Sequence, residues 1–394
     1  MAARPPVAAR TVVAALMPIM VVVFVAFLVV GLALPVLPLY VHQGLGLGAF
    51  VVGLVAGTQF AASFVSRLWA GHYADSRGAK RAVIVGLLMA AASGLLYLLS
   101  LRFTYAPVAS VSILLAGRAL LGGAESFVMT GALSLGLSSA GPRNTGKVIA
   151  WVGTAMFGAF ALGAPLGSAL YAAYGFTAIT LVTIVAPLVT LLIVLPLKPV
   201  APTNRARPAF GKVIGAVWLP GLGMAFSSIG FGATLTFVTL LFAERGWNPT
   251  WPGLTLFALA FILMRSLFGH LPDRIGGTRV ALASVVAEAA GLVLIWLAPW
   301  PALALAGATL TGLGYSLVYP GFGVEAVRRA PLESRGLATG AYTAFIDLAL
   351  GIAGPALGLV AGWDGMGAVF LVSALLVLCA APVAVRLLRT PSPS

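Results

Sequence analysis

Three charged residues stand inside long apolar stretches of the sequence, where a charge is costly to bury. Arg118 and Glu125 lie seven residues apart in one stretch, and Asp347 lies in another. Seven residues make two helical turns, so Arg118 and Glu125 share a helix face, about 10 Å apart. Burial disfavours the charged form of a carboxyl group, whereas a nearby arginine favours that form. A buried carboxyl group close to an arginine can therefore exchange a proton. We predict that Asp347 or Glu125 carries the proton and that Arg118 binds an anionic group or tunes the acid. The alternative is a static ion pair that holds helices together.

The apolar stretches around these residues are long enough to cross a membrane as helices. Of 394 residues, 61% are hydrophobic and 8% are charged, whereas soluble domains carry about a quarter charged residues. A spanning helix needs about 20 apolar residues, and the alternation of a barrel strand is missing from the sequence. We expect twelve helices, at 12–40, 47–70, 82–101, 108–132, 148–173, 176–197, 213–243, 251–269, 280–298, 301–326, 337–361 and 366–388.

The basic residues fall mainly in the short gaps between these stretches. One side of the membrane receives nearly all of them, and the other side receives Arg102 and Arg245. By the positive-inside rule, both chain ends lie in the cytoplasm, and the protein is a multi-pass protein of the cytoplasmic (inner) membrane. The net charge of +14 therefore indicates topology rather than a nucleic-acid partner.

One segment of the chain occurs twice at a constant offset, each time after the second helix of a half. The shared residues are Arg67, Gly71, His72, Asp75, Gly78 and Arg81 in the first copy, and Arg265, Gly269, His270, Asp273, Gly276 and Arg279 in the second. Internal repeats of this kind are typical of transporters. The repeat predicts two equivalent six-helix bundles, 1–197 and 213–394, joined by a cytoplasmic linker at 198–212.

The repeated segment resembles the loop signature Gly-x-x-x-Asp-x-x-Gly-x-(Lys/Arg)-(Lys/Arg) of the major facilitator superfamily. The matching residues are Gly71, Asp75, Gly78, Lys80 and Arg81 in the first copy, and Gly269, Asp273, Gly276 and Arg279 in the second. Ser76 stands where the family commonly has a basic residue. The resemblance implies a gate at the cytoplasmic face. We expect Asp75 to stabilise the state of the transporter that is closed on this side. The alternative is that Asp75 has a purely structural role in the turn.

Two further motifs extend the resemblance. Arg118 followed by Gly122 resembles the family's fourth-helix motif. The fifth helix resembles the Gly-rich motif of the drug/proton antiporter branch, with Gly153, Gly158, Gly163, Pro165 and Gly167, and the eleventh carries a shorter counterpart, Gly351, Gly354, Pro355 and Gly358. Glycine permits close helix packing and proline permits a bend, so these positions form either a hinge or seal between the halves, or simple close packing.

The resemblance implies an all-α membrane protein with two pseudo-symmetric bundles, which exports a small organic solute against protons by alternating access. Arg118 and Asp347 would lie about 15 Å and 16 Å into their helices, near the mid-membrane depth of such sites. A proton-coupled importer of a metabolite such as a sugar or organic acid is the first alternative. A non-transporting receptor on the same scaffold is the second.

We assign smaller roles to the remaining charged and aromatic residues. We expect Arg67 and Arg265 to reach lipid headgroups or the loop acids, and we rank Glu288 low because the resemblance places its helix at the periphery. An apolar substrate cavity could be lined by Phe226, Phe231, Tyr315, Tyr319 and Tyr342. Without metal-ligand spacing, an ATP-binding loop or a nucleophile elbow, we expect no metal, no cofactor and no enzymatic activity. We expect the partners to be a small solute, protons and the lipid bilayer, and we expect a monomer.

Overall fold

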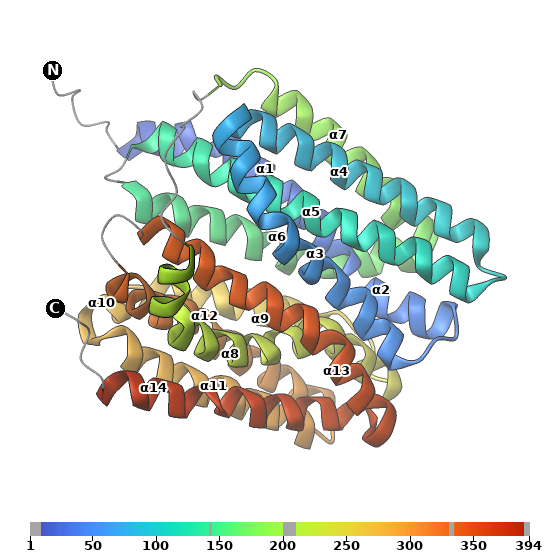
Figure 1. Ribbon diagram of the computed structural model, residues 1–394. Helices are drawn as coiled ribbons and strands as arrows, with labels where there is room; N and C mark the ends of the chain where they lie inside the picture. Colours follow the sequence, from blue (N-terminus) through green and yellow to red (C-terminus); the bar gives the residue numbers. More distant parts are fainter. Residues whose placement is uncertain (1–8, 142–143, 200–209, 331–334, 390–394) are drawn as a thin grey trace, which may run out of the picture.

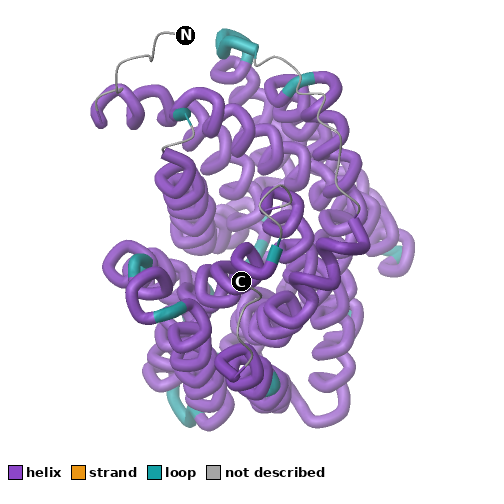
Figure 2. Tube along the Cα trace, turned by 60° about the vertical axis from the view of Figure 1, so that its left-hand side comes forward, coloured by secondary structure: helices purple, strands orange, loops and turns teal. Residues whose placement is uncertain are grey.

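The computed structural model describes residues 9–141, 144–199, 210–330 and 335–389. These residues form helices joined by short turns, and no strand occurs among them (Figure 2). A helix pairs its backbone N–H and C=O groups within the segment, as hydrocarbon surroundings require. The all-helical class expected from the sequence is confirmed.

The N-terminal half contains the first six membrane-crossing segments. The first is α1 (Ala9–Ala33), continued by α2 (Val36–Leu39) and a π-helical turn (Tyr40–Gly44). The others are α3 (Ala49–Arg77), α4 (Ala79–Ser100) with a 3-10 turn at Leu101–Phe103, α5 (Pro107–Ala140), α6 (Thr145–Tyr174) and α7 (Phe176–Val194).

The C-terminal half repeats this pattern. Its helices are α8 (Phe210–Glu244), α9 (Pro252–Phe268), α10 (Leu271–Ile275), α11 (Gly277–Leu297), α12 (Pro301–Arg329), α13 (Arg335–Leu378) and α14 (Ala380–Arg389). The long α13 is broken at Asp364 and Gly365, whose backbone is not helical, and therefore holds two spans. In the described residues 10 helices, α13 among them, are long and apolar enough to cross a membrane, and α9 is a shorter apolar helix. The expected twelve crossings are thus present.

The turns after α3 and α10 repeat the same backbone conformation. Gly78 has φ +99° and ψ 145°, and Gly276 has φ +97° and ψ 130°. This region is open to glycine and strained for other residues, so the helix can end there in the same way in both halves. α3 runs to Arg77, beyond the expected end at 70, because nothing before Gly78 breaks the helix. Gly71 and Asp75 consequently lie in the last turns of a helix and not in a loop, which corrects the expected boundary.

The two halves lie side by side, with α4, α5 and α7 on one side of the molecule and α11 and α14 on the other (Figure 1). Within the N-terminal half α4 packs against α5 and α7, and α1 packs against α6. Within the C-terminal half α11 packs against α12, and α8 packs against α13. We call the end of the bundle that carries Gly78 and Gly276 the loop-motif end, and the end that carries Arg102 and Arg245 the opposite end.

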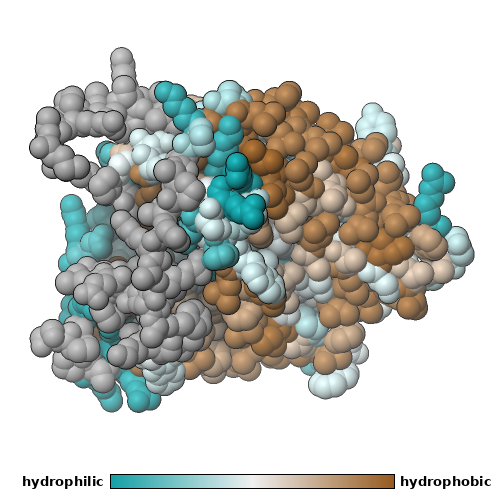
Figure 3. Space-filling view, turned by 45° about the horizontal axis from the view of Figure 1, so that its top comes forward, coloured by the Kyte–Doolittle hydropathy of each residue, from teal (hydrophilic) through white to brown (hydrophobic). Residues whose placement is uncertain are grey.

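The outer surface of the bundle is apolar around its middle. Figure 3 shows apolar residues across the middle of the visible face and hydrophilic residues toward its ends. Large apolar side chains are exposed on helices of both halves, among them Leu95, Leu192, Leu263 and Leu375. Such a surface suits lipid as the solvent, and the chain is a multi-pass membrane protein.

Candidate functional site

The two halves touch most closely where α3 crosses α13. A Cβ on Gly53 of α3 would lie 2.0 Å from the carbonyl oxygen of Gly354 of α13. A Cβ on Gly57 would lie 3.0 Å from Cδ of Pro355, and one on Gly358 would lie 2.5 Å from the backbone of α3. Small residues let two backbones approach in this way. We call this contact between the two halves the α3/α13 seam. The helices touch here near the opposite end, so the seam is closed at that end. Two of the expected hinge or packing residues, Gly354 and Pro355, lie in it.

An ion pair joins the halves further along the same seam. Arg67 lies about 21 Å along α3 from Gly53, and its Nε donates to Oδ2 of Asp347 on α13 at 2.8 Å. Nη2 of Arg67 contacts the same oxygen. The side chains are 25% and 7% exposed. Arg67 was expected to reach headgroups or the loop acids, and this expectation is wrong, because the side chain turns inward to a buried acid of the other half.

Glu125 on α5 lies next to this ion pair. Nε2 of Gln59 on α3 donates to its Oε2 at 2.8 Å. Glu125 also interacts electrostatically with Asp347, Arg67 and Arg118. Gln59 is fully buried and Glu125 is partly buried. The three residues selected from the sequence, Arg118, Glu125 and Asp347, thus lie in one group with Arg67 and Gln59, which we call the central polar cluster.

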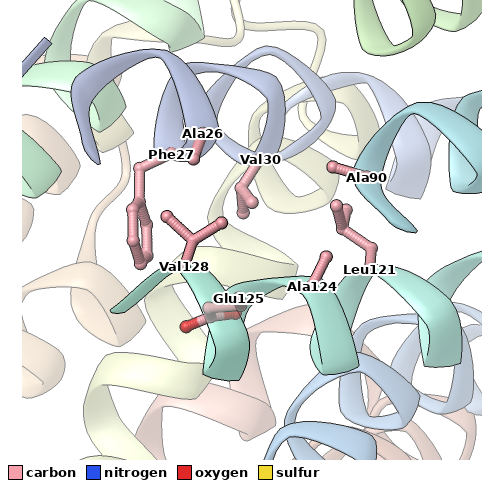
Figure 4. A pocket seen from close by; sticks show the side chains of 8 residues that line it. All are labelled: Ala26, Phe27, Val30, Ala90, Leu121, Ala124, Glu125 and Val128. Carbon is pink, nitrogen blue, oxygen red and sulfur yellow. The ribbon is translucent and has the colours of Figure 1, made fainter. Parts of the chain in front are cut away.

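The pocket beside Glu125 is otherwise apolar. It has about 240 Å³ of empty volume, part of it open to solvent. Figure 4 shows side chains of α1, α4 and α5 around it, with the Glu125 carboxylate as the only side-chain oxygen among those drawn. The lining residues are Ala26, Phe27, Val30, Ala90, Leu121, Ala124, Glu125 and Val128. Since none of the other lining residues is charged, the groups that set the charge of Glu125 come from α3, α5 and α13.

Arg118 on α5 is 2% exposed. Its Nε donates to the carbonyl oxygen of Val55 on α3 at 3.2 Å. Its Nη1 is buried without a hydrogen-bond partner. The hydroxyl group of Tyr97 on α4 interacts with it electrostatically. Arg118 is therefore a buried cation with few of its donors satisfied.

The loop motifs lie at the surface of the loop-motif end. Asp75, Arg81, Asp273 and Arg279 are exposed. Lys80 donates from Nζ to the carbonyl oxygen of Leu195, at the end of α7, at 2.6 Å. The gate role of these motifs stays a prediction.

The glycines of α6 have two different surroundings. A Cβ on Gly163 would lie 2.6 Å from the backbone carbon of Gly31 on α1, and one on Gly167 would lie 2.2 Å from the carbonyl oxygen of Leu32. No atom lies within 4 Å of a Cβ built on Gly158. Gly163 and Gly167, which flank Pro165, therefore pack inside the N-terminal half and not against the other half.

A second seam joins α6 to α9. Phe157 of α6 stacks on Phe261 of α9 with ring centroids 3.5 Å apart. Oγ1 of Thr255 donates to the carbonyl oxygen of Ala161 at 3.0 Å. Behind this stack Phe231 and Tyr315 lie parallel, 4.6 Å between centroids. Several aromatic residues proposed as a cavity lining are thus packed against one another, since Phe231, Tyr315 and Tyr342 are nearly fully buried.

Glu288 on α11 is fully buried, at 0% exposure. Ser227 of α8 donates a hydrogen bond to its Oε2, and its Oε1 has no partner. α11 does lie at the edge of the bundle, where Val286 is exposed, but Glu288 faces α8 and α12. We ranked Glu288 low because its helix was expected at the periphery. That ranking did not consider which face of the helix carries Glu288, and this face is turned toward the interior.

Arg265, the repeat equivalent of Arg67, makes a different contact. Its Nη1 donates to the carbonyl oxygen of Ser316 at 3.3 Å, inside its own half. Tyr319 and Tyr342 interact with it electrostatically. The expectation that it reaches headgroups or loop acids is therefore not met by these contacts.

One member of the central polar cluster was missed as a site residue. Gln59 is one of two glutamines in the chain and stands in an apolar helix. This isolated polar residue was the signal that could have identified it.

Among the described residues no group of three His, Cys, Asp or Glu is placed to hold a metal ion.

The model of the Major Facilitator Superfamily matches residues 19–254 and 221–394. The chain belongs to the Major Facilitator Superfamily. An uncharacterized MFS-type transporter of Salmonella typhimurium (strain LT2) is 43% identical over 366 residues, 93% of this chain and 94% of the relative. One from Burkholderia mallei (strain SAVP1) is 42% identical over 351 residues, 89% and 86% of the two chains. The protein is thus an MFS transporter.

Solved structures of the superfamily share its fold. A bacterial homolog of the human lysosomal transporter Spinster, inward-facing and unoccupied, aligns with TM-score 0.76 at 13% identity, covering 97% of this chain and 98% of that one. The E. coli fucose:proton symporter FucP aligns with TM-score 0.66 at 15% identity, covering 96% and 99%. In this MFS transporter the central polar cluster lies at the boundary between the two halves.

Proposed function

We propose that this MFS transporter exports a small organic solute in exchange for protons by alternating access. One observation carries the proposal: an ion pair between Arg67 and Asp347 crosses the boundary between the halves, and Glu125 beside it interacts electrostatically with both of these residues and with Arg118. Ionisable groups at membrane depth are costly and are retained where they serve a proton or substrate pathway. The resemblance of α6 to the antiporter motif supports export.

The ion pair provides a way for a proton to change the shape of the protein. Protonation of Asp347 removes the charge that holds Arg67, so the attraction across the α3/α13 seam falls. Glu125 feels the same charges, so a proton on either acid alters the other. A proton can therefore favour separation of the halves at this seam, which is the movement that alternating access needs.

The units that move are, on this proposal, residues 1–197 and 213–394, with the linker 198–212 between them. Most of the linker lies outside the described residues. The bundle spans the inner membrane. Its loop-motif end faces the cytoplasm, because most of the basic residues lie at this end. A reporter enzyme that is active only outside the cytoplasm, fused after Ser394, should stay inactive, and activity there would reverse the orientation.

The test is flux in proteoliposomes with an imposed pH gradient and a panel of drugs and metabolites. Asp347→Asn and Glu125→Gln should abolish acceleration by the gradient. Glu244→Gln, which changes an exposed acid at the end of α8, should leave it intact. Gradient-driven transport that persists in both cluster variants would refute proton coupling through these acids. Ligand binding without flux would favour the receptor alternative.

Import of an organic acid together with protons is the second candidate. The buried guanidinium of Arg118, with Nη1 unpartnered, favours it, because an anion could satisfy that group. Reversing the direction of the pH gradient separates the candidates. An importer accumulates solute on the alkaline side, and an exporter accumulates it on the acidic side.

A further inference from the structure

A second pocket lies between the two halves, toward the opposite end from the loop motifs. It has about 350 Å³ of empty volume, including space open to solvent. Its lining residues come from the first span, α3, α5 and α8, and are Ala33, Leu34, Leu37, Pro38, Val52, Val55, Ala56, Phe60, Arg118, Leu235 and Thr236. Arg118 is the one charge in this lining, and the remainder is apolar except for the Thr236 hydroxyl.

The charge of Arg118 is poorly compensated in this setting. The side chain is 2% exposed, and Nη1 has no partner. The hydrogen bond to Val55 is long, at 3.2 Å. Among the described residues no carboxylate forms an ion pair with Arg118. A buried charge usually has a paired and hydrogen-bonded partner, so an anion in the pocket would supply what the protein does not.

The chemistry of the walls restricts that anion. A guanidinium binds a carboxylate through two parallel hydrogen bonds. One arginine and one hydroxyl would leave most oxygens of a phosphate or sulfate unsatisfied, at a cost in desolvation. Leucine, valine and phenylalanine walls suit an apolar body. A monovalent organic anion fits these requirements.

We infer that Arg118 binds the carboxylate of a small organic anion whose apolar body lies between the halves, and that Glu125 takes up a proton as the anion binds. The inference rests on the second candidate function, which is import of an organic acid together with protons. It gives that transport a substrate class, which is an aliphatic or aromatic monocarboxylate.

The proton follows from the position of Glu125. It interacts with Arg118 of its own helix, with Arg67 of α3 and with Asp347 of α13. Residues of α1 and α4 at its pocket, Phe27, Val30 and Ala90 among them, carry no charge. An anion on Arg118 reduces the positive potential at Glu125 and repels its carboxylate, so binding favours the protonated form. Anion and proton then move in the same direction.

Binding can be measured without any gradient, as thermal stabilisation of the detergent-purified protein. The probes are butyrate, hexanoate and benzoate, each paired with its neutral amide. We expect at least one acid to stabilise the protein while its amide does not. Arg118→Gln should weaken that binding by about tenfold to a hundredfold. Arg118→Lys keeps the charge, should bind with intermediate affinity, and serves where the glutamine variant fails to fold.

Arg102→Gln is the matched control, because this arginine is exposed at the opposite end. It should bind the acid as the unmodified protein does. Protection by none of the acids, equal protection by acid and amide, or unchanged binding in Arg118→Gln would each overturn the inference.

Calorimetry in two buffers of different ionisation enthalpy measures the proton taken up with the anion. We expect uptake of up to one proton for each anion, so that affinity falls by up to about tenfold per pH unit as the pH rises. Glu125→Gln should remove this uptake, and uptake that persists in this variant would contradict the role of Glu125. Because no gradient is used, anion binding without gradient-driven flux would count against the proposed function and not against this site.

Discussion

The two seams that join the halves occupy equivalent places in the repeat but use different chemistry. In the α3/α13 seam, glycine backbones touch and an ion pair lies at the inner end. In the α6/α9 seam, an aromatic stack and one hydroxyl make the contact. Asp347 stands eight residues before Pro355, and Phe157 stands eight residues before Pro165. The same position therefore carries an acid in one seam and a phenyl ring in the other.

This difference separates two properties that a transporter needs. A seam held by an ion pair can respond to a proton, because protonation removes one of the charges. A seam held by stacked rings has no titratable group and keeps its strength as the pH changes. We expect the α3/α13 seam to act as the proton-sensitive contact and the α6/α9 seam as a pH-independent one.

The largest effect should come from a side chain inserted into the glycine contact. Gly53→Val would place Cβ against the carbonyl oxygen of Gly354, so α3 and α13 must separate. Overpacking of this kind should destabilise the closed seam by about 3 kcal/mol or more, which is about two orders of magnitude in population. Spin labels at the exposed Phe50 and Leu359, in a background without Cys379, should report longer distances.

Gly362→Ala is the control for this change. It also adds a methyl group to α13, at a position where no atom lies within 4 Å of the new Cβ. Distances and transport should stay within about twofold of the parent. If the two variants behaved alike, close contact at Gly53 would not be what holds the seam.

The next largest effect should come from the ion pair, and it should be unequal between the partners. Arg67→Gln leaves Asp347 buried at 5% exposure without its cation, at a cost of about 3 kcal/mol. Asp347→Asn removes the anion that pairs with Arg67. The Arg67 side chain is 25% exposed and can reach water, so the cost in stability is about 1 kcal/mol. Thermal unfolding in detergent measures both.

The double variant Arg67→Gln with Asp347→Asn should recover most of the stability lost in Arg67→Gln, because neither charge is then left unpaired. Its transport should also be insensitive to the pH gradient. Additive losses in the double variant would show that the two residues stabilise the seam independently.

A smaller effect is expected from the aromatic stack. Phe157→Leu keeps an apolar side chain and removes the stacking on Phe261, at a cost of about 2 kcal/mol. Transport should slow, while its dependence on the pH gradient should keep the shape of the parent profile. A shifted pH profile would mean that the α6/α9 seam also takes part in the proton response.

The smallest effect should come from the hydroxyl that crosses the second seam. Thr255→Val removes the hydrogen bond to Ala161 with little change of shape, at a cost of about 1 kcal/mol. Thr309→Val is a suitable comparison, since that hydroxyl bonds to Leu305 in its own helix. The bond across the seam should affect transport more than the bond within a helix, and equal effects would argue against a role for the seam.

The sequence by itself determined the class of protein and most of its helices. Apolar stretches of about 20 residues predict spanning helices because no other backbone arrangement pairs its polar groups in lipid. The repeated Gly78 and Gly276 predicted two equivalent halves, and both residues adopt the same backbone conformation with a positive φ. Arg118, Glu125 and Asp347 could be selected because each charge is conspicuous in an apolar helix.

Only the tertiary structure decided which of these groups meet. Arg67 and Asp347 are 280 residues apart in the chain, and no local pattern couples them. Helix periodicity places a residue on a face but does not say which helix covers that face, so the inward turn of Arg67 and the burial of Glu288 could not be derived. The physical reason is that local hydrogen bonding and hydropathy fix the helices, whereas partners are chosen by packing between distant segments.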